Sequence, residues 1–173
     1  MKLIKLRKED EKEFKKLMID AFQFGYESYT KQKEEQVLPE CDIDHSLNDP
    51  KGIGYEMIDE DGTILGGAIV NINLETNINY LDFLFVRIDM ESHGIGKLIW
   101  NEIEKLHPET IKWQTCTPYF DQRNIHFYVN KLKFHIVEYY NKYHIDPHME
   151  EDYKGDETDD FDGGMFEFEK VMK

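Results

Sequence analysis

Residues 84–97, Leu-Phe-Val-Arg-Ile-Asp-Met-Glu-Ser-His-Gly-Ile-Gly-Lys, join an apolar strand to a helix through a loop with two glycines. The strand is expected over 79–87, which is rich in β-forming residues and almost continuously apolar. Helical spacing follows in Leu98, Ile99, Ile103 and Leu106. The missing Cβ atoms of Gly94 and Gly96 let a ligand approach the backbone, where the N–H groups of a helix start attract anions. This predicts a phosphate-binding loop, with a tight strand-to-helix turn as the plainer alternative.

The residues before this stretch predict a strand, helices and a hairpin. Residues 2–6 alternate polar and apolar, as in a half-buried strand. An apolar stripe at helical spacing then predicts a first helix, through Phe14, Leu17, Met18, Ala21 and Phe22. From Gly25 to Pro50 the pattern is irregular, and we expect a short second helix followed by a loop. Residues 53–58 and 63–73 flank Asp59-Glu60-Asp61-Gly62, which predicts two antiparallel strands joined by a tight turn.

The residues after it predict strands around one more helix. Strands are expected near 111–116, 134–139 and 165–171. The spacing of Ile125, Tyr128, Val129 and Leu132 predicts the helix between the first two of these strands. Together the elements predict a mixed α/β fold.

The composition and the charge exclude several classes of function. The 173 residues, 40% of them hydrophobic, suit a single globular domain over 1–173. The net charge of −15 repels nucleic-acid phosphates and anionic membranes, and favours cationic partners. No stretch has the roughly 20 apolar residues of a membrane helix, and the charged N-terminus argues against a signal peptide, so we expect a cytoplasmic protein. Two cysteines allow neither a disulfide framework nor a four-thiolate zinc site, and we expect no metal.

The glycine loop in its context resembles the acyl-CoA-binding motif of the GCN5-related N-acetyltransferase (GNAT) superfamily. That motif reads Gln/Arg-x-x-Gly-x-Gly/Ala, five residues after a strand Val. Val86, Gly94 and Gly96 match it, whereas Glu91 replaces the usual Gln or Arg. The backbone donors of such a loop do not depend on side-chain identity.

A second resemblance lies downstream. Residues 121–128, Asp-Gln-Arg-Asn-Ile-His-Phe-Tyr, resemble the family's Asn-x-x-Ala-x-x-Phe-Tyr helix, with Asp121 and Asn124 at the Asn and Ala positions. Lys131-Leu132-Lys133-Phe134 resembles the Lys-Leu-Gly-Phe ending, with one extra residue after Tyr128. The order of elements also resembles the family over nearly the whole chain. The resemblance implies a mostly antiparallel central sheet of about seven strands flanked by about four helices.

The resemblance further implies direct transfer of an acetyl group from acetyl-CoA, as cosubstrate, to a primary amine. The implied cofactor contacts are Leu84, Phe85, Val86, Glu91, Ser92, His93, Gly94, Ile95, Gly96 and Lys97, with Asp121 and Asn124 as alternatives downstream. Tyr128 occupies the position of the family's general acid, with core packing as the competing role, and the family uses the backbone N–H on the strand at Val86 for the oxyanion. A noncatalytic acyl-CoA-binding sensor or protein-interaction domain of the same fold is the alternative function.

The residues leave the base and the acceptor open. Asp82 shares strand parity with Tyr80, Leu84 and Val86, so it is a candidate base facing the reaction groove; a sheet-surface carboxylate or a water chain are the alternatives. Cys116 could accept acetyl, but burial as a small hydrophobe is the expectation. The segment 146–162 holds nine acidic residues and one Lys, which favours a cationic small molecule or a lysine or N-terminal amine of a peptide as acceptor. A homodimer remains open.

Overall fold

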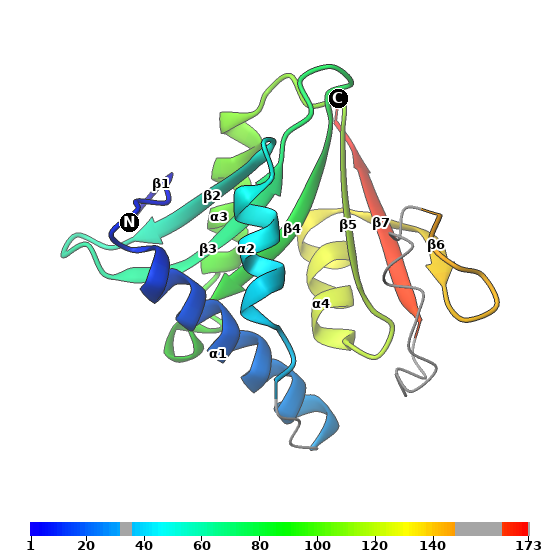
Figure 1. Ribbon diagram of the computed structural model, residues 1–173, viewed down its shortest axis with the longest axis horizontal. Coiled ribbons are helices and arrows are strands. Elements are labelled where there is room, and N and C mark those ends of the chain that lie inside the picture. The colour runs from blue at the N-terminus through cyan, green and yellow to red at the C-terminus, as the bar shows by residue number, and fades with distance from the viewer. Residues whose placement is uncertain (32–35, 148–163, 173) are drawn as a thin grey trace. The chain divides into compact units, whose positions relative to one another are not determined.

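The computed structural model describes residues 1–31, 36–147 and 164–172. These residues form seven strands and four α-helices, so the mixed α/β class predicted from the sequence is confirmed (Figure 1). The chain divides into two compact units, residues 1–113 with Met172 and residues 114–171.

The first unit is built on four antiparallel strands in the order β1-β2-β3-β4. The strands are β1 (Lys2–Lys5), β2 (Gly52–Ile58), β3 (Ile64–Asn71) and β4 (Ile78–Val86). The predicted hairpin is confirmed as β2 and β3. In its turn, Gly62 has φ 83°, and the carboxylate of Asp59 accepts a backbone N–H from Thr63 at 2.9 Å. Asp59 thus supplies the turn acceptor and Gly62 the positive φ.

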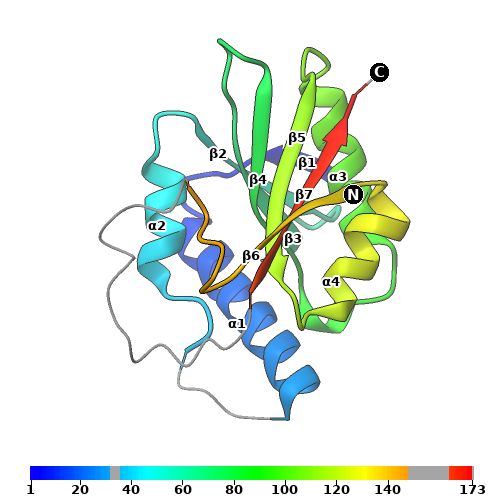
Figure 2. The same cartoon turned by 90° about the vertical axis from the view of Figure 1, so that its right-hand side faces the viewer.

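Helices cover both faces of this sheet (Figure 2). They are α1 (Glu11–Thr30) and α2 (Glu40–Asn48) on one face, and α3 (Ile95–Leu106) on the other. Two consecutive glycines of β3 allow the close approach. A Cβ atom on Gly66 would lie 3.1 Å from Ile99 of α3, and one on Gly67 only 2.3 Å from Phe14 of α1. Because neighbouring strand residues face opposite sides, the pair Gly66-Gly67 lets one helix approach each face.

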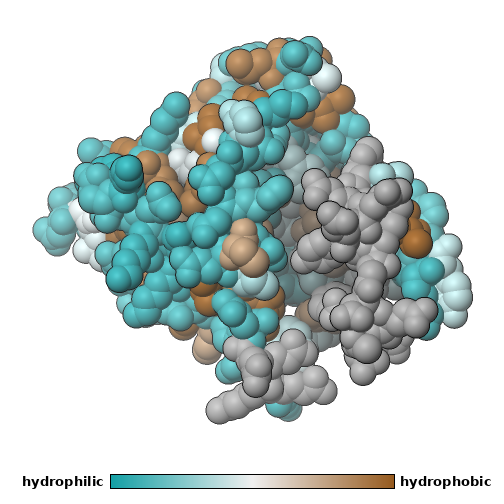
Figure 3. All heavy atoms as spheres, in the orientation of Figure 1, coloured by the Kyte–Doolittle hydropathy of each residue, from teal (hydrophilic) through white to brown (hydrophobic). Residues whose placement is uncertain are grey.

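The core between the sheet and the first two helices is aromatic and aliphatic. Phe14, Met18, Ile43 and Ile69 have no exposed surface. The Phe14 and Phe85 rings meet edge to face, with their centroids 5.1 Å apart. Burial of each such side chain contributes about 1.5–3 kcal/mol. The outer surface of α1 and α2 is mostly hydrophilic, as an amphipathic helix requires (Figure 3).

The first helix is longer than the sequence suggests. It continues through Gly25 to Thr30 and ends at Lys31, whose φ is 57°. The expected break at Gly25 was therefore wrong, because residues 25–30 belong to α1, whereas the expected short second helix is confirmed as α2 (Glu40–Asn48). Gly25 costs helix propensity but does not break the backbone hydrogen bonds, so it does not end the helix.

The second unit contains β5 (Lys112–Pro118, which begins in the first unit), β6 (His135–Tyr140) and β7 (Met165–Val171). Its strand order is β5-β7-β6, with β6 and β7 antiparallel. The helical segment after β5 starts as α4 (Gln122–His126) and continues as a π-helix (Phe127–Leu132). Tyr128 and Phe168 form the centre of the unit, with ring centroids 5.5 Å apart.

The π-helix accounts for the extra residue seen in the sequence after Tyr128. A π turn holds one more residue than an α turn, and such turns are frequent at functional sites. The segment ends at Lys133, whose φ of 69° places a lysine in the left-handed region where the related motif has glycine. The N–H of Phe134 donates to the Tyr128 carbonyl at 3.0 Å. The helix expected here is confirmed, but its second half is not an α-helix.

Candidate functional site

The glycine loop leaves β4 through a 3-10 turn (Ile88–Met90) and enters α3. Two of its residues have a positive φ, Ser92 at 64° and Gly94 at 77°. Gly94 is the N-cap of α3, and its carbonyl accepts the N–H of Leu98 at 3.1 Å. A Cβ atom on Gly94 would meet nothing within 4 Å, so the space beside the loop is open. Left-handed backbone is costly for other residues, which explains the glycine.

The start of α3 suits an anion. The N–H groups of Ile95, Gly96 and Lys97 have no partner within the helix, as in any first turn. No side chain caps this end, and its first turn has no acidic residue. By contrast, α1 and α2 each carry two carboxylates in their first turn. Since carboxylates neutralise the positive end of a helix, only α3 among these three keeps that end available for a bound phosphate.

The side chains of the loop differ in exposure. Ser92, His93, Gly94 and Lys97 are exposed, Glu91 is half-buried, and Ile95 and Gly96 are buried. The Glu91 carbonyl lies 2.7 Å from Nδ1 of His93, so this histidine folds back on its own loop. The exposed Ser92, His93 and Lys97 therefore flank the start of α3.

On β4, the three predicted contact residues point to two faces. Phe85 pairs with Gly67 and is buried against Phe14 on the α1 side. Leu84 pairs with Ala68 and Val86 with Gly66, which places both on the opposite face, with α3. Phe85 can therefore reach a ligand only through its backbone.

Asp82 lies at an irregularity in β4. Ile69 of β3 pairs with Phe83 and Val70 pairs with Leu81, so Asp82 is the extra residue of a β-bulge. The bulge reverses the strand parity. Tyr80 is on the face of Phe83, whereas Leu84 is on the other. The parity argument that grouped Asp82 with Tyr80 and Leu84 was therefore wrong, because one unpaired residue shifts every side chain beyond it.

The environment of Asp82 raises its pKa to about 6. The main cause is burial, and the nearby Asp49 adds to it. Two α2 residues act in the opposite sense, because the Ser46 hydroxyl donates a hydrogen bond and His45 is close enough to favour the charge. Asp82 is thus a half-buried carboxylate turned toward the end of α2, and is a stronger base than an ordinary aspartate.

Tyr128 lies inside the second unit. Its side chain is buried, and its hydroxyl shares a hydrogen bond with the side chain of Thr115. Burial raises the pKa of the phenol above its ordinary value, and the nearby Cys116 and Asp121 act in the same direction. The phenol therefore stays protonated throughout the neutral range. Tyr128 therefore packs in the core of this unit, and its phenol is a weaker acid than that of an exposed tyrosine.

Asp121 and Asn124 belong to the start of α4. The Asp121 carboxylate accepts the backbone N–H of Asn124 at 2.9 Å, so it serves as the N-cap of this helix. Burial raises the pKa of Asp121, although the Asn124 bond opposes the rise. One carboxylate oxygen thus has a structural role, and the Asn124 side chain is half-buried.

The cysteine expected to be buried is exposed. On β5, Trp113, Thr115 and Thr117 are buried, which turns Cys116 outward. The exposure of Cys116 follows from the alternation of side chains along the strand and not from its hydrophobicity.

Most of the acidic segment 146–162 lies outside the described residues. Within the described ranges, no group of three or more His, Cys, Asp and Glu residues is placed to hold a metal ion. No helix in the described part of the chain is long and apolar enough to cross a membrane.

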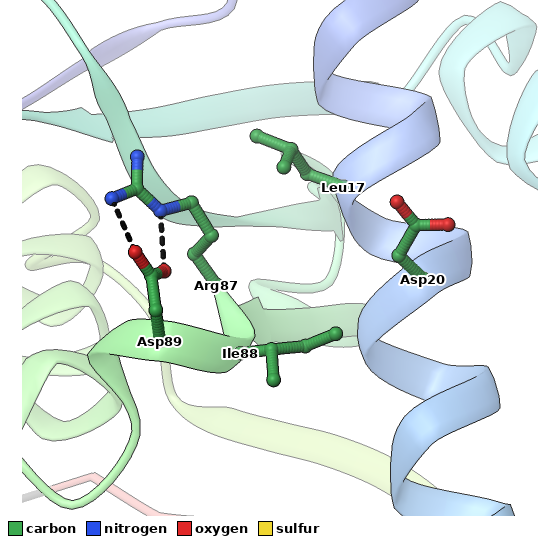
Figure 4. A pocket seen from close by; sticks show the side chains of 5 residues that line it. All are labelled: Leu17, Asp20, Arg87, Ile88 and Asp89. Atoms are coloured by element: carbon green, nitrogen blue, oxygen red, sulfur yellow. Dashed lines mark hydrogen bonds and ion pairs between the residues drawn. The ribbon is translucent and has the colours of Figure 1, made fainter.

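Sequence reasoning missed an ion pair at the start of the loop. Arg87 binds Asp89 through two contacts, Nε to Oδ1 at 2.6 Å and Nη2 to Oδ2 at 2.8 Å. Beside the pair is a pocket of about 220 Å³ (Figure 4). It is lined by Leu17, Asp20, Arg87, Ile88 and Asp89. The spacing Arg87-x-Asp89 is the sequence feature that could have predicted this ion pair.

Known proteins share this sequence pattern and this fold. The model of the acetyltransferase (GNAT) family matches residues 12–134. The uncharacterized protein YrkN of Bacillus subtilis (strain 168) is 40% identical over 178 residues, 99% of this chain and 94% of YrkN. PaiA N-acetyltransferase from Thermoplasma acidophilum, solved with coenzyme A, has a TM-score of 0.65 at 17% identity. The match covers 99% of this chain and 98% of the PaiA chain. A GNAT-family acetyltransferase from Staphylococcus aureus Mu50 has a TM-score of 0.67 at 15% identity, with 99% of both chains covered.

Proposed function

The chain belongs to the acetyltransferase (GNAT) family, and from this premise we propose that it transfers the acetyl group of acetyl-CoA directly to a primary amine. The proposal treats residues 1–173 as one N-acetyltransferase domain. The observation that carries it is the uncapped start of α3 behind a loop with two positive φ values. Acetyl-CoA supplies the activated acetyl thioester and a pyrophosphate that such a helix start can bind.

The loop residues bind and orient the cosubstrate in this proposal. The N–H groups of Ile95, Gly96 and Lys97 donate to the pyrophosphate, and the exposed Lys97 ammonium adds a positive charge. Ser92 and His93 line the same surface. The backbone of β4 at Leu84, Phe85 and Val86 holds the arm that leads to the thioester, and the resemblance assigns the oxyanion to the N–H of Val86. Holding the thioester in place supplies much of the catalysis in a direct transfer.

Asp82 is the general base in the proposal. An attacking amine must lose a proton, and a carboxylate with a pKa of about 6 is mostly ionised at pH 7 yet more basic than a normal aspartate. Ser46 orients this carboxylate through its hydroxyl. The proton passes from the ammonium to Asp82 and from there to solvent.

Tyr128 is the general acid. Its phenol, kept protonated by burial, gives a proton to the sulfur of the departing thiolate and regains one from the attacking nitrogen as that nitrogen becomes an amide. The hydrogen bond with Thr115 sets the direction of the hydroxyl. Tyr128→Phe should lower kcat by about 100-fold and leave the KM of acetyl-CoA within about twofold. Tyr143→Phe is the matched control, because Tyr143 is 88% exposed. Equal kcat values in the two variants would remove Tyr128 from the mechanism.

The acceptor in this proposal is cationic, such as a polyamine, an aminoglycoside or a lysine side chain. Support comes from the net charge of −15 and from the acidic 146–162 segment. Asp49, which is close enough to raise the pKa of Asp82, adds a second negative charge at the proposed base. A protonated amine is attracted to such a field before it is deprotonated.

The test is release of free CoA thiol from acetyl-CoA over a panel of polyamines, aminoglycosides, amino acids and basic peptides. Calorimetric binding of acetyl-CoA is measured alongside. Thiol release with cationic acceptors supports both the reaction and the acceptor class. Release only with neutral or anionic amines contradicts the acceptor class alone. Binding without release from any amine contradicts the proposed transfer and favours an acyl-CoA sensor, and no binding contradicts the role of the loop.

A further inference from the structure

Arg87 connects the end of β4 to the strand beside it and to the turn that follows. Its backbone N–H donates to the Leu65 carbonyl at 2.9 Å, one step beyond the paired residues of β3 and β4. Its Nη1 donates to the Ile64 carbonyl at 3.2 Å. The same guanidinium holds Asp89 at two points, 2.6 and 2.8 Å. One side chain therefore joins β3 to the 3-10 turn that begins the glycine loop.

The position of this turn sets the position of the loop. The Arg87 carbonyl accepts the N–H of Met90 at 2.8 Å, and the Ile88 carbonyl accepts that of Glu91 at 3.4 Å. Glu91 in turn contacts His93 through its carbonyl. The far end of the loop is held by α3, whose Ile99 is fully buried. The near end, the 3-10 turn, has no fully buried residue, so its placement depends more on these polar contacts.

The turn lies beside an open space, so the ion pair is needed to hold it in place. The pocket of about 220 Å³ lies between the turn and α1, and Leu17 and Asp20 of α1 line its far side (Figure 4). The pocket leaves part of the α1 side of the turn unfilled, so the turn has room to shift. A two-point Arg–carboxylate contact resists such a shift, since it fixes both distance and orientation.

We propose that Arg87 is a positioning residue that, through Asp89 and the Ile64 carbonyl, holds the glycine loop in the geometry that binds the pyrophosphate of acetyl-CoA. This inference rests on the proposed function. Arg87 acts through the loop and does not itself contact the cosubstrate. Asp89 is therefore as necessary as Arg87, although a carboxylate near a phosphate would otherwise weaken binding.

The experiment is a double-mutant cycle with Arg87→Met, Asp89→Ala and the double variant, read by calorimetric binding of acetyl-CoA. Each single variant should weaken binding about 5- to 10-fold, and the double variant should resemble the singles, because each substitution breaks the same link. Arg87→Lys, which keeps the charge without the two-point contact, should fall between. Lys105→Met is the matched control, because it removes a 2.6 Å ion pair with Glu102 at the other end of α3.

A second cosubstrate distinguishes a loss of pyrophosphate binding at the glycine loop from a general loss of activity. S-acetylpantetheine carries the thioester without the pyrophosphate, so its kcat/KM should stay within about twofold in all variants. Circular dichroism and thermal midpoints check folding, and Arg87→Lys and Asp89→Ala suffice if Arg87→Met does not fold.

The outcomes separate this inference from the function on which it rests. A wild-type protein that does not bind acetyl-CoA overturns both. If the wild type binds, variants with unchanged affinity overturn the positioning role alone. A loss confined to the Arg87 variants, with Asp89→Ala unchanged or tighter, also overturns it, because it indicates direct contact between Arg87 and the cosubstrate. Additive losses of affinity in the double variant also overturn the positioning role, because they show that Arg87 and Asp89 act independently.

Discussion

Replacing Asp82 with asparagine should stabilise the protein at neutral and alkaline pH. Folding raises the pKa of this carboxyl from 3.8 to about 6, chiefly by burial. The folded state therefore holds the proton more tightly than the unfolded chain does. That contribution to stability is complete below pH 3.8 and is lost as the pH rises through 6. A shift of about 2 pKa units corresponds to about 3 kcal/mol of unfolding free energy.

The gain from Asp82→Asn should therefore grow with pH. It should be about 1 kcal/mol at pH 4.5 and about 3 kcal/mol at pH 8, because asparagine keeps the shape and cannot ionise. The assay is urea unfolding of wild type and variant at several pH values between these limits. Asp61→Asn in the exposed hairpin turn is the matched control, and its effect should not follow this curve.

The same substitution should lower the activity while it raises the stability. If Asp82 is the base, kcat/KM of the wild type should fall below about pH 6, and the variant should be slow and lose this dependence. A variant that is less stable than wild type at pH 8, or whose stability difference does not change with pH, would contradict the burial effect on Asp82. An unchanged pH–rate profile would instead reject the catalytic role while leaving the electrostatics intact.

Four substitutions test other parts of the structure. Gly94→Ala and Gly62→Ala should each cost about 1–2 kcal/mol in urea unfolding, because both positions have a positive φ and open space, but only Gly94→Ala should weaken acetyl-CoA binding. Equal affinities would contradict the role of the loop. Gly67→Ala should destabilise by about 1–3 kcal/mol, since its Cβ would lie 2.3 Å from Phe14; unaltered stability would contradict this packing. Cys116→Ala should keep thiol release, and its loss would indicate an acetyl-cysteine intermediate.

Much of the fold could be predicted from local patterns. The Asp-Gly turn at Gly62 fixed the hairpin, because few residues tolerate a φ of 83°. The stripe that includes Phe14 and Met18 predicted α1, because helical spacing places those side chains on one face. The glycine loop was visible for the same reason, since Gly94 sits at a positive φ before a helix. These features depend on residues close together in the chain.

Other features depended on packing between distant residues. Cys116 is exposed because Trp113 and Thr115 take the inward positions of β5, which hydrophobicity alone does not reveal. The extra residue after Tyr128 was visible in the sequence, but a longer loop could have absorbed it. It became a π-helix between two buried rings, Tyr128 and Phe134, whose centroids lie 5.8 Å apart. An insertion between two packed residues must be taken up by the backbone between them.

Local spacing was enough to predict the class of fold, the glycine loop and the resemblance to the acetyltransferases, because each depends on residues near one another in the chain. The raised pKa of Asp82 and the support of the glycine loop arise only in the folded protein. The bulge that turns Asp82 toward α2 is defined by the pairing of β4 with β3, and its pKa of about 6 by burial. The link from Arg87 to Ile64 likewise joins two strands. Strand register, burial and electrostatic fields arise only when distant segments meet.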